Sequence, residues 1–279
     1  MKDKPIDIIN RMEIFLSAIY QDAQDTKNGL FYRRVPVDTK NSIIFSYDPS
    51  YPRFLKFDAT NLIKTLENIC KFFLYSTEYA DIYILFQLKN YSPKSVHFDI
   101  KIKSSHSVMR PSHYYLSKIN NYLKKANESM ISHNDGEFLI SFSAALTGDR
   151  AIQRQINIKN QTNTNILVAC DDDALFDTIS AQINFLGLKV IGKNDLGNLM
   201  RHIKDSIFTP FVIFIDSKIL KDEAMLEDIL EFKNIKNFRI VAICKSDESA
   251  NDLPNNVTIL KQPFSTDSFQ LAFKNSLEK

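Results

Sequence analysis

A run of apolar positions in the C-terminal half of the chain ends at a single carboxylate. Residues 211–215 are all apolar, most of them β-branched or aromatic, and they lead directly into Asp216. Such a run predicts a strand that is buried on both faces, as in the centre of a parallel sheet. Open α/β sheets bind ligands at the carboxyl ends of such strands. Asp216 is therefore a candidate site residue, although an aspartate that only caps the next helix would occupy the same place.

Apolar runs and helical periodicity alternate from residue 164 to the C-terminus. Strands are predicted at 166–169, 188–191, 211–216, 238–244 and 257–260. Apolar spacings of three and four residues predict helices at 174–186, 196–207, 224–232 and 266–277, with a weak signal at 246–251. Five strands alternating with five helices in about 115 residues predict a doubly wound α/β domain with a five-stranded parallel sheet.

The first part of the chain has a different pattern. Amphipathic helices are predicted at 8–24, 59–73 and 114–126, and strands at 30–35, 42–47, 53–57, 81–88, 96–103, 137–145 and 151–158. The last four strands are expected to form two hairpins, and runs of strands with helices between them predict an α+β sandwich. The polar stretch 160–165 has the composition of a linker, so we expect domains at 1–160 and 164–279.

Composition narrows the classes of function. A length of 279 residues with 44% hydrophobic content suits two globular domains, and a net charge of +2 gives no reason to expect a nucleic acid partner. Cys70, Cys170 and Cys244 lie far apart in apolar surroundings, which favours free thiols over a disulfide framework or a zinc site. No run of about 18 apolar residues occurs, so we expect no membrane span. These features together predict a cytoplasmic protein.

Residues 164–279 resemble the receiver domain of two-component signalling proteins. That family has an acidic pair after strand 1, a phosphorylated aspartate after strand 3, a Thr or Ser after strand 4 and a Lys-Pro pair after strand 5. The matching positions here are Cys170-Asp171 or Asp171-Asp172, then Asp216, Cys244 and Lys261-Gln262-Pro263. The resemblance implies that Asp216 accepts a phosphoryl group and that Lys261 pairs with one of its oxygens. It also implies Mg²⁺, a cation that prefers oxygen ligands, at Asp171, Asp172 and Asp216.

Three positions depart from that family pattern. One alignment puts the first acid on Cys170, and a shift of one residue gives Asp171-Asp172 instead. Cys244 offers a thiol, a weak hydrogen-bond donor, where the family has a hydroxyl. Gln262 falls on the lysine position with Lys261 one residue early, and successive strand residues point to opposite faces. Two outcomes stay open: a receiver that still accepts a phosphoryl group, and a domain that acts by docking alone.

Residues 8–158 resemble, less closely, the ATP-binding domain of histidine kinases. The best match begins at Phe57-Asp58-Ala59-Thr60-Asn61-Leu62 and continues through Asn68 and Phe72-Phe73 to Thr77-Glu78. The family helix carries an earlier asparagine and a later one that binds Mg²⁺. Spacing from Asp58 puts these positions on Asn68 and Phe72. The other register puts Asn68 on the metal position, but it moves Asp58 and Thr77 out of register.

Glycines that such an ATPase needs are missing from this chain. The family holds the nucleotide on an Asp-x-Gly-x-Gly turn and a glycine-rich lid, because backbone amides approach phosphates closely only where side chains are absent. No glycine occurs between Phe98 and Asp135, where both loops belong. We therefore expect no ATP binding in the family manner and no kinase activity.

Together, the two resemblances imply the C-terminal part of a hybrid histidine kinase, with a degenerate ATPase-like domain before a receiver. The alternative is an adaptor that works without phosphorylation, both domains being catalytically inactive. The resemblance implies a histidine kinase or a phosphotransfer protein as partner, and it leaves open whether the chain forms a homodimer.

Overall fold

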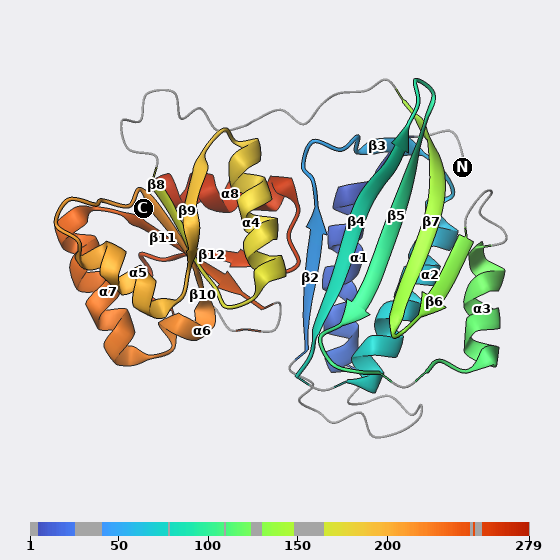
Figure 1. The fold of residues 1–279 in the computed structure, drawn as a ribbon, viewed down its shortest axis with the longest axis horizontal. Helices are drawn as coiled ribbons and strands as arrows, with labels where there is room; N and C mark the ends of the chain where they lie inside the picture. The colour runs from blue at the N-terminus through green and yellow to red at the C-terminus, as the bar shows by residue number, and fades with distance from the viewer. Residues whose placement is uncertain are drawn as a thin grey trace. The chain divides into compact units, whose positions relative to one another are not determined.

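The computed structural model divides the chain into two compact units, Met1–Ile152 and Gln153–Lys279 (Figure 1). It describes residues 5–25, 41–77, 79–108, 110–123, 130–147, 165–245, 248 and 253–278. The predicted linker at 160–165 lies almost entirely outside these ranges, so the domain boundary there stays a prediction. Among the described residues, no helix is both long enough and apolar enough to cross a membrane.

The first unit is built on a mixed seven-stranded sheet in the order β1-β3-β7-β5-β4-β2, with β6 pairing with β7. Its strands are β1 (Ile6–Asp7), β2 (Ser42–Tyr47), β3 (Phe54–Lys56), β4 (Asp81–Tyr91), β5 (Ser95–Ser104), β6 (Met130–Asn134) and β7 (Glu137–Leu146). Its helices are α1 (Ile8–Asp25), α2 (Ala59–Ser76) and α3 (His113–Leu123). Helices α1 and α2 lie against one face of the sheet, which gives the predicted α+β sandwich (Figure 1).

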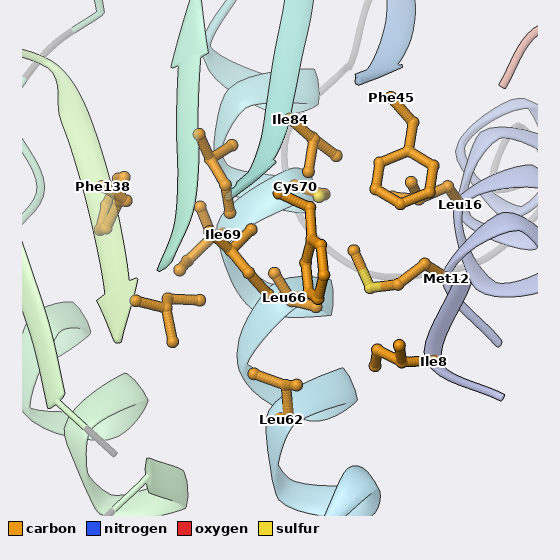
Figure 2. Close-up of a cluster of buried hydrophobic side chains, with 14 of the residues drawn as sticks. Ile8, Met12, Leu16, Phe45, Leu62, Leu66, Ile69, Cys70, Ile84 and Phe138 are labelled. Carbon is orange, nitrogen blue, oxygen red and sulfur yellow. The ribbon is translucent and has the colours of Figure 1, made fainter. Parts of the chain in front are cut away.

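Alternation along the strands explains this packing, because every second side chain points to the helices. Ile84 of β4 and Phe138 of β7 are fully buried, and Figure 2 shows them facing Leu66 and Ile69 of α2. Met12 of α1 enters the same core beside the α2 side chains. The apolar faces predicted for the two helices are therefore the faces that pack on the sheet.

One hairpin of the first unit differs from the prediction. The structure pairs β7 with β6 on its outer side, through a turn at Asp135 and Gly136, which both have positive φ. A turn of this type favours Asp-Gly, because glycine adopts positive φ without steric cost. The sequence prediction had missed β6 and had paired 137–145 with 151–158. That second segment and the predicted strand at 30–35 lie outside the described residues.

The second unit has a five-stranded, fully parallel sheet in the order β12-β11-β10-β8-β9. Its strands are β8 (Asn165–Ala169), β9 (Lys189–Asn194), β10 (Val212–Asp216), β11 (Arg239–Cys244) and β12 (Thr258–Lys261). Its helices are α4 (Asp173–Phe185), α5 (Leu196–Lys204), α6 (Ser217–Leu220), α7 (Glu223–Lys236) and α8 (Thr266–Leu277). This is the doubly wound, flavodoxin-like strand order, as predicted for 164–279. The short helix α6 was not predicted.

Helices cover both faces of the second sheet. Phe214 of β10 stacks on Phe269 of α8 with ring centroids 5.1 Å apart, and α4 covers the same face beside β8 and β9. Ile213, one residue earlier, packs on the opposite face with Leu199 of α5 and Ile229 of α7. Burial on both faces explains why residues 212–215 of β10 are apolar at every position. The order of strands reverses between β8 and β10, and a ligand is expected at the carboxyl ends there.

Candidate functional site

Strand register brings most of the sequence-predicted site positions of the second unit to one edge of its sheet. Ala169 pairs with Ile215 across β8 and β10, so Cys170 and Asp216 follow at the same level. On the other side, Asp216 pairs with Ile243, and Cys244 pairs with Lys261. The carboxyl ends of four neighbouring strands therefore carry these positions, at the edge where the strand order reverses.

Asp216 is largely buried, with a side-chain exposure of 15%. Its Oδ1 accepts a hydrogen bond of 2.9 Å from the backbone N–H of Lys218, and so caps helix α6. The Lys218 Nζ lies 3.9 Å from Oδ2. Burial raises the pKa of Asp216 above its ordinary value, while the hydrogen bond and the charge of Lys218 oppose this shift. Asp216 thus caps a helix, and it lies at the edge of the sheet where a ligand is expected.

The acidic residues after β8 lie at the start of helix α4. Asp172 caps this helix, since its Oδ1 accepts a hydrogen bond of 2.8 Å from the N–H of Leu175, and Asp171 and Asp173 are exposed. Cys170 is fully buried, and its thiol donates to the carbonyl of Asp172 at 3.6 Å. Across the part of the chain that the structure describes, no group of three or more His, Cys, Asp or Glu side chains could hold a metal ion. The Mg²⁺ site at Asp171, Asp172 and Asp216 stays a prediction.

Lys261 and Gln262 lie on opposite sides of the β12 end. Lys261 is exposed, whereas Gln262 is 7% exposed and its backbone N–H donates to the carbonyl of Cys244 at 2.9 Å. Among the described ion pairs, the ammonium that pairs with Asp216 is that of Lys218, and no described ion pair involves Lys261. A role for Lys261 beside a phosphoryl group therefore stays a prediction.

Glu248, which the sequence prediction had not singled out, contributes a further carboxylate next to Asp216. Its Oε2 accepts hydrogen bonds from the Ser217 hydroxyl and, at 2.9 Å, from the N–H of Lys245. Its Oε1 lies 2.7 Å from the Nζ of Lys221. Burial disfavours the ionised form of Glu248, but the hydrogen bonds from Lys221, Ser217 and Lys245 outweigh it and lower the pKa. The sequence carries little signal for this contact, because Lys245 lacks the hydroxyl that a capping box with Glu248 would need.

Cys244 lies at the end of β11 and is 1% exposed. Burial raises the pKa of its thiol to about 11, and the negative charge of Glu248 adds to the rise. The thiol is therefore neutral at physiological pH. Where the receiver family that this unit resembles has a hydroxyl, this chain has a weak donor, and the nearby hydroxyl of Ser217 donates to Glu248.

In the first unit, aromatic packing surrounds the position that the resemblance aligns with a metal-binding asparagine. The ring of Phe72 lies 5.3 Å from the ring of Tyr115, 5.6 Å from Phe73 and 5.8 Å from Phe138, measured between centroids. Tyr115 also donates its hydroxyl to the backbone carbonyl of Asn68. An aromatic cluster thus occupies this part of helix α2, with Phe73 and Phe138 fully buried and Phe72 and Tyr115 half-buried.

The two other aligned positions of that helix make local contacts. Asp58 caps α2, because its Oδ1 accepts a hydrogen bond of 3.3 Å from the N–H of Asn61. The Asn68 side chain donates to the carbonyl of Lys64 at 2.7 Å, one turn earlier on the helix. Both contacts are structural, and neither directs a ligand-binding group away from the helix.

Comparison with known proteins adds information on the fold. No protein-family model and no curated protein sequence matches the chain. Among solved structures, full-length ShkA in complex with AMPPNP is similar to 99% of this chain at 13% identity, with a TM-score of 0.60. The match covers 57% of ShkA, so this chain spans less than two thirds of that protein. At this identity the likeness shows a shared fold.

Two further solved structures each match about half of the chain or less. A CheY-like response regulator receiver domain protein from Methanospirillum hungatei JF-1 matches 42% of this chain and 95% of its own, at 18% identity and a TM-score of 0.33. The histidine kinase AdeS of Acinetobacter baumannii matches 52% of this chain and 68% of its own, at 8% identity and a TM-score of 0.34.

Proposed function

We propose that this chain is a two-component signalling protein, in which a histidine-kinase-like domain without ATP chemistry supports a receiver domain that accepts a phosphoryl group on Asp216. The observation that carries the proposal is the position of Asp216. It is a largely buried carboxylate at the carboxyl end of the central parallel strand β10, next to the point where the strand order reverses. The shared fold with ShkA over nearly the whole chain supports the combination of the two domains.

The geometry of Asp216 suggests which oxygen reacts. Oδ1 is held by the backbone N–H of Lys218, so Oδ2 is the oxygen that we assign as nucleophile. Oδ2 forms a bond to the phosphorus of the donor, the bond from phosphorus to the donor breaks, and the donor leaves with the electron pair. The ammonium of Lys218, 3.9 Å from Oδ2, reduces the negative charge at this step.

Mg²⁺ would neutralise charge on the transferred phosphoryl group when bound. The oxygens of Asp171, Asp172 and Asp216 have the chemistry that this cation prefers, and Mg²⁺ commonly uses only one or two carboxylates together with waters and phosphate oxygens. Asp172 also caps α4 through its Oδ1. The phosphoryl donor would be a histidine kinase or a phosphotransfer protein.

In the first domain, the residues at the positions that align with the nucleotide-binding residues of histidine kinases support a scaffold role. The rings of Phe73, Tyr115 and Phe138 pack around Phe72, at the position that the resemblance aligns with the family's metal-binding asparagine. The chain also has no glycine between Phe98 and Asp135, the region in which that family binds the nucleotide. We infer a pseudokinase, a kinase-like domain that holds partners and does not transfer phosphate.

An adaptor that works without phosphorylation is the second candidate. Lys261 is exposed and is not paired with Asp216 in the described structure, and the anionic side chain of Glu248 lies beside the site. Both observations favour a domain that binds partners in one fixed state.

Beryllium fluoride, an analogue of the phosphoryl group, separates these two functions. With Mg²⁺, it should raise the melting temperature of the wild-type chain, because a ligand of the folded state stabilises it, and it should leave Asp216→Asn unchanged. A wild-type chain that shows no rise supports the adaptor instead. Equal rises in both proteins would mean that the analogue binds elsewhere.

A further inference from the structure

The contacts of Glu248 form a cluster that phosphoryl transfer at Asp216 does not itself require. Both carboxylate oxygens are engaged, one by Ser217 and by the backbone of Lys245, the other by Lys221. The side chain of Glu248 is only 14% exposed. A hydroxyl, an ammonium and a backbone N–H therefore converge on one anion, at the ligand-binding edge of the second sheet.

Local capping accounts for only part of this arrangement. A glutamate commonly reaches back to the backbone N–H three residues earlier, which explains the contact with Lys245. Ser217 and Lys221 come from a different part of the chain, the segment around helix α6 that begins immediately after Asp216. Two contacts thus join the carboxylate to the neighbouring strand end, and local turn geometry does not require them.

The donors around Glu248 are those that bind phosphate. Hydroxyl, ammonium and backbone N–H groups make charge-assisted hydrogen bonds to phosphate oxygens as they do to carboxylates. Lys204 and Asp228 in the same unit provide a contrast, since both side chains are half exposed and, among the described residues, their 3.2 Å ion pair is joined by no hydroxyl or backbone donor. The Glu248 cluster differs because its carboxylate is largely buried, although Lys221 is half exposed, and because three kinds of donor meet there.

We propose that Ser217, Lys221 and the backbone N–H of Lys245 form a binding site for a tetrahedral oxyanion, and that Glu248 fills this site as an internal ligand. The site exists whether or not Asp216 is phosphorylated. If Asp216 does accept a phosphoryl group, which rests on the function proposed above, that group competes with Glu248 for Ser217 and Lys221. Phosphorylation then releases the chain around Glu248 from helix α6.

Removal of the Glu248 carboxylate tests this site directly. In Glu248→Ala, inorganic phosphate should raise the melting temperature in a concentration-dependent manner, at an ionic strength held constant with chloride. We expect phosphate to bind this variant about tenfold or more tightly than the wild type, in which the internal carboxylate competes at high effective concentration. Far-UV circular dichroism verifies that the variant is folded. Glu248→Gln, which keeps the shape and loses the charge, should show a smaller gain of the same sign.

Two controls make the result specific. Phosphate binding gained by Glu248→Ala should be lost when Lys221→Met is added. Asp228→Ala, which removes the acid of the exposed pair with Lys204, should gain none. Equal phosphate binding by Glu248→Ala and wild type would overturn the proposal, as would a gain that survives Lys221→Met or appears equally in Asp228→Ala.

The same titration separates this proposal from the proposed function. In an Asp216→Asn background, Glu248→Ala should still gain phosphate binding, because Asp216 supplies none of the donors. A failure of phosphoryl transfer would instead appear as a wild-type chain that does not respond to beryllium fluoride. Loss of the phosphate gain in the Asp216→Asn background would contradict a site that is independent of Asp216.

Discussion

Replacing Phe72 by asparagine restores the residue type that the kinase resemblance expects at this position, and it should destabilise the first unit without creating an ATP site. The ring contacts Phe73, Tyr115 and Phe138 at centroid distances of 5.3 to 5.8 Å. A fully buried Phe→Ala change costs about 3 to 5 kcal/mol. Because Phe72 is only half-buried, we expect a loss of about 2 to 3 kcal/mol in the free energy of unfolding, including the lost ring pairs.

Hydrogen exchange followed by mass spectrometry measures this loss in each unit separately. Where exchange follows unfolding of the unit, amides of α2 and β7 should exchange roughly 30- to 150-fold faster in Phe72→Asn, while those of β8 and β10 keep their rates. Tyr75→Asn on the same helix is the matched control, since Tyr75 is 47% exposed and its replacement should cost about 0.5 kcal/mol or less. Calorimetry with ATP and Mg²⁺ should detect no binding by either variant.

Two results would refute this reasoning. If Phe72→Asn exchanges no faster than Tyr75→Asn, the aromatic cluster does not stabilise the unit. If Phe72→Asn binds ATP with micromolar affinity, the position is a metal site that lost only its ligand, and the lack of glycine between Phe98 and Asp135 does not prevent nucleotide binding.

Three further predictions concern the site residues and the nucleotide. Asp172→Ala removes the cap of helix α4 and should lower the free energy of unfolding by about 1 kcal/mol, measured by urea titration. Burial raises the pKa of the Asp216 carboxyl above its ordinary 3.8, so the folded state binds a proton at this carboxyl more tightly than the unfolded state does. The stability that this group contributes therefore falls as the pH rises above 3.8. Asp216→Asn should remove that part of the pH dependence of the free energy of unfolding, measured by urea titrations between about pH 4 and 7. ATP with Mg²⁺ should leave the melting temperature of the wild-type chain unchanged, and a saturable rise would contradict the pseudokinase.

The parts of the fold that local pattern determines could be predicted from the sequence. Residues 212–215 are apolar at every position because helices cover both faces of their sheet, and residues 96–103 alternate between apolar and polar because helices cover one face of theirs. Strand β6 was missed because Ser132, His133 and Asn134 give it little apolar alternation, and its place depends on pairing with β7. Pairing between segments is a tertiary property that a single short segment does not encode.

The candidate site was predictable to a similar degree. The position of Asp216 followed from one apolar run, and the structure places it at the expected strand end. The contacts of Glu248 could not be predicted, because they join two loops whose approach depends on the register of β10 against β11. The pairing of β12 with β11 sets Lys261 opposite Cys244, and there Lys261 is exposed and Gln262 buried, a choice that counting residues had left open.

The most direct test of the account compares two phosphoryl donors on the same protein. The full chain is incubated with Mg²⁺ and either acetyl phosphate or ATP, and the mass of the intact protein and of its peptides is measured. Acetyl phosphate should add one phosphoryl group on the peptide that contains Asp216, Asp216→Asn should gain none there, and ATP should add none to either protein. A phosphoryl group from ATP, or no group on Asp216 from acetyl phosphate, would contradict the account.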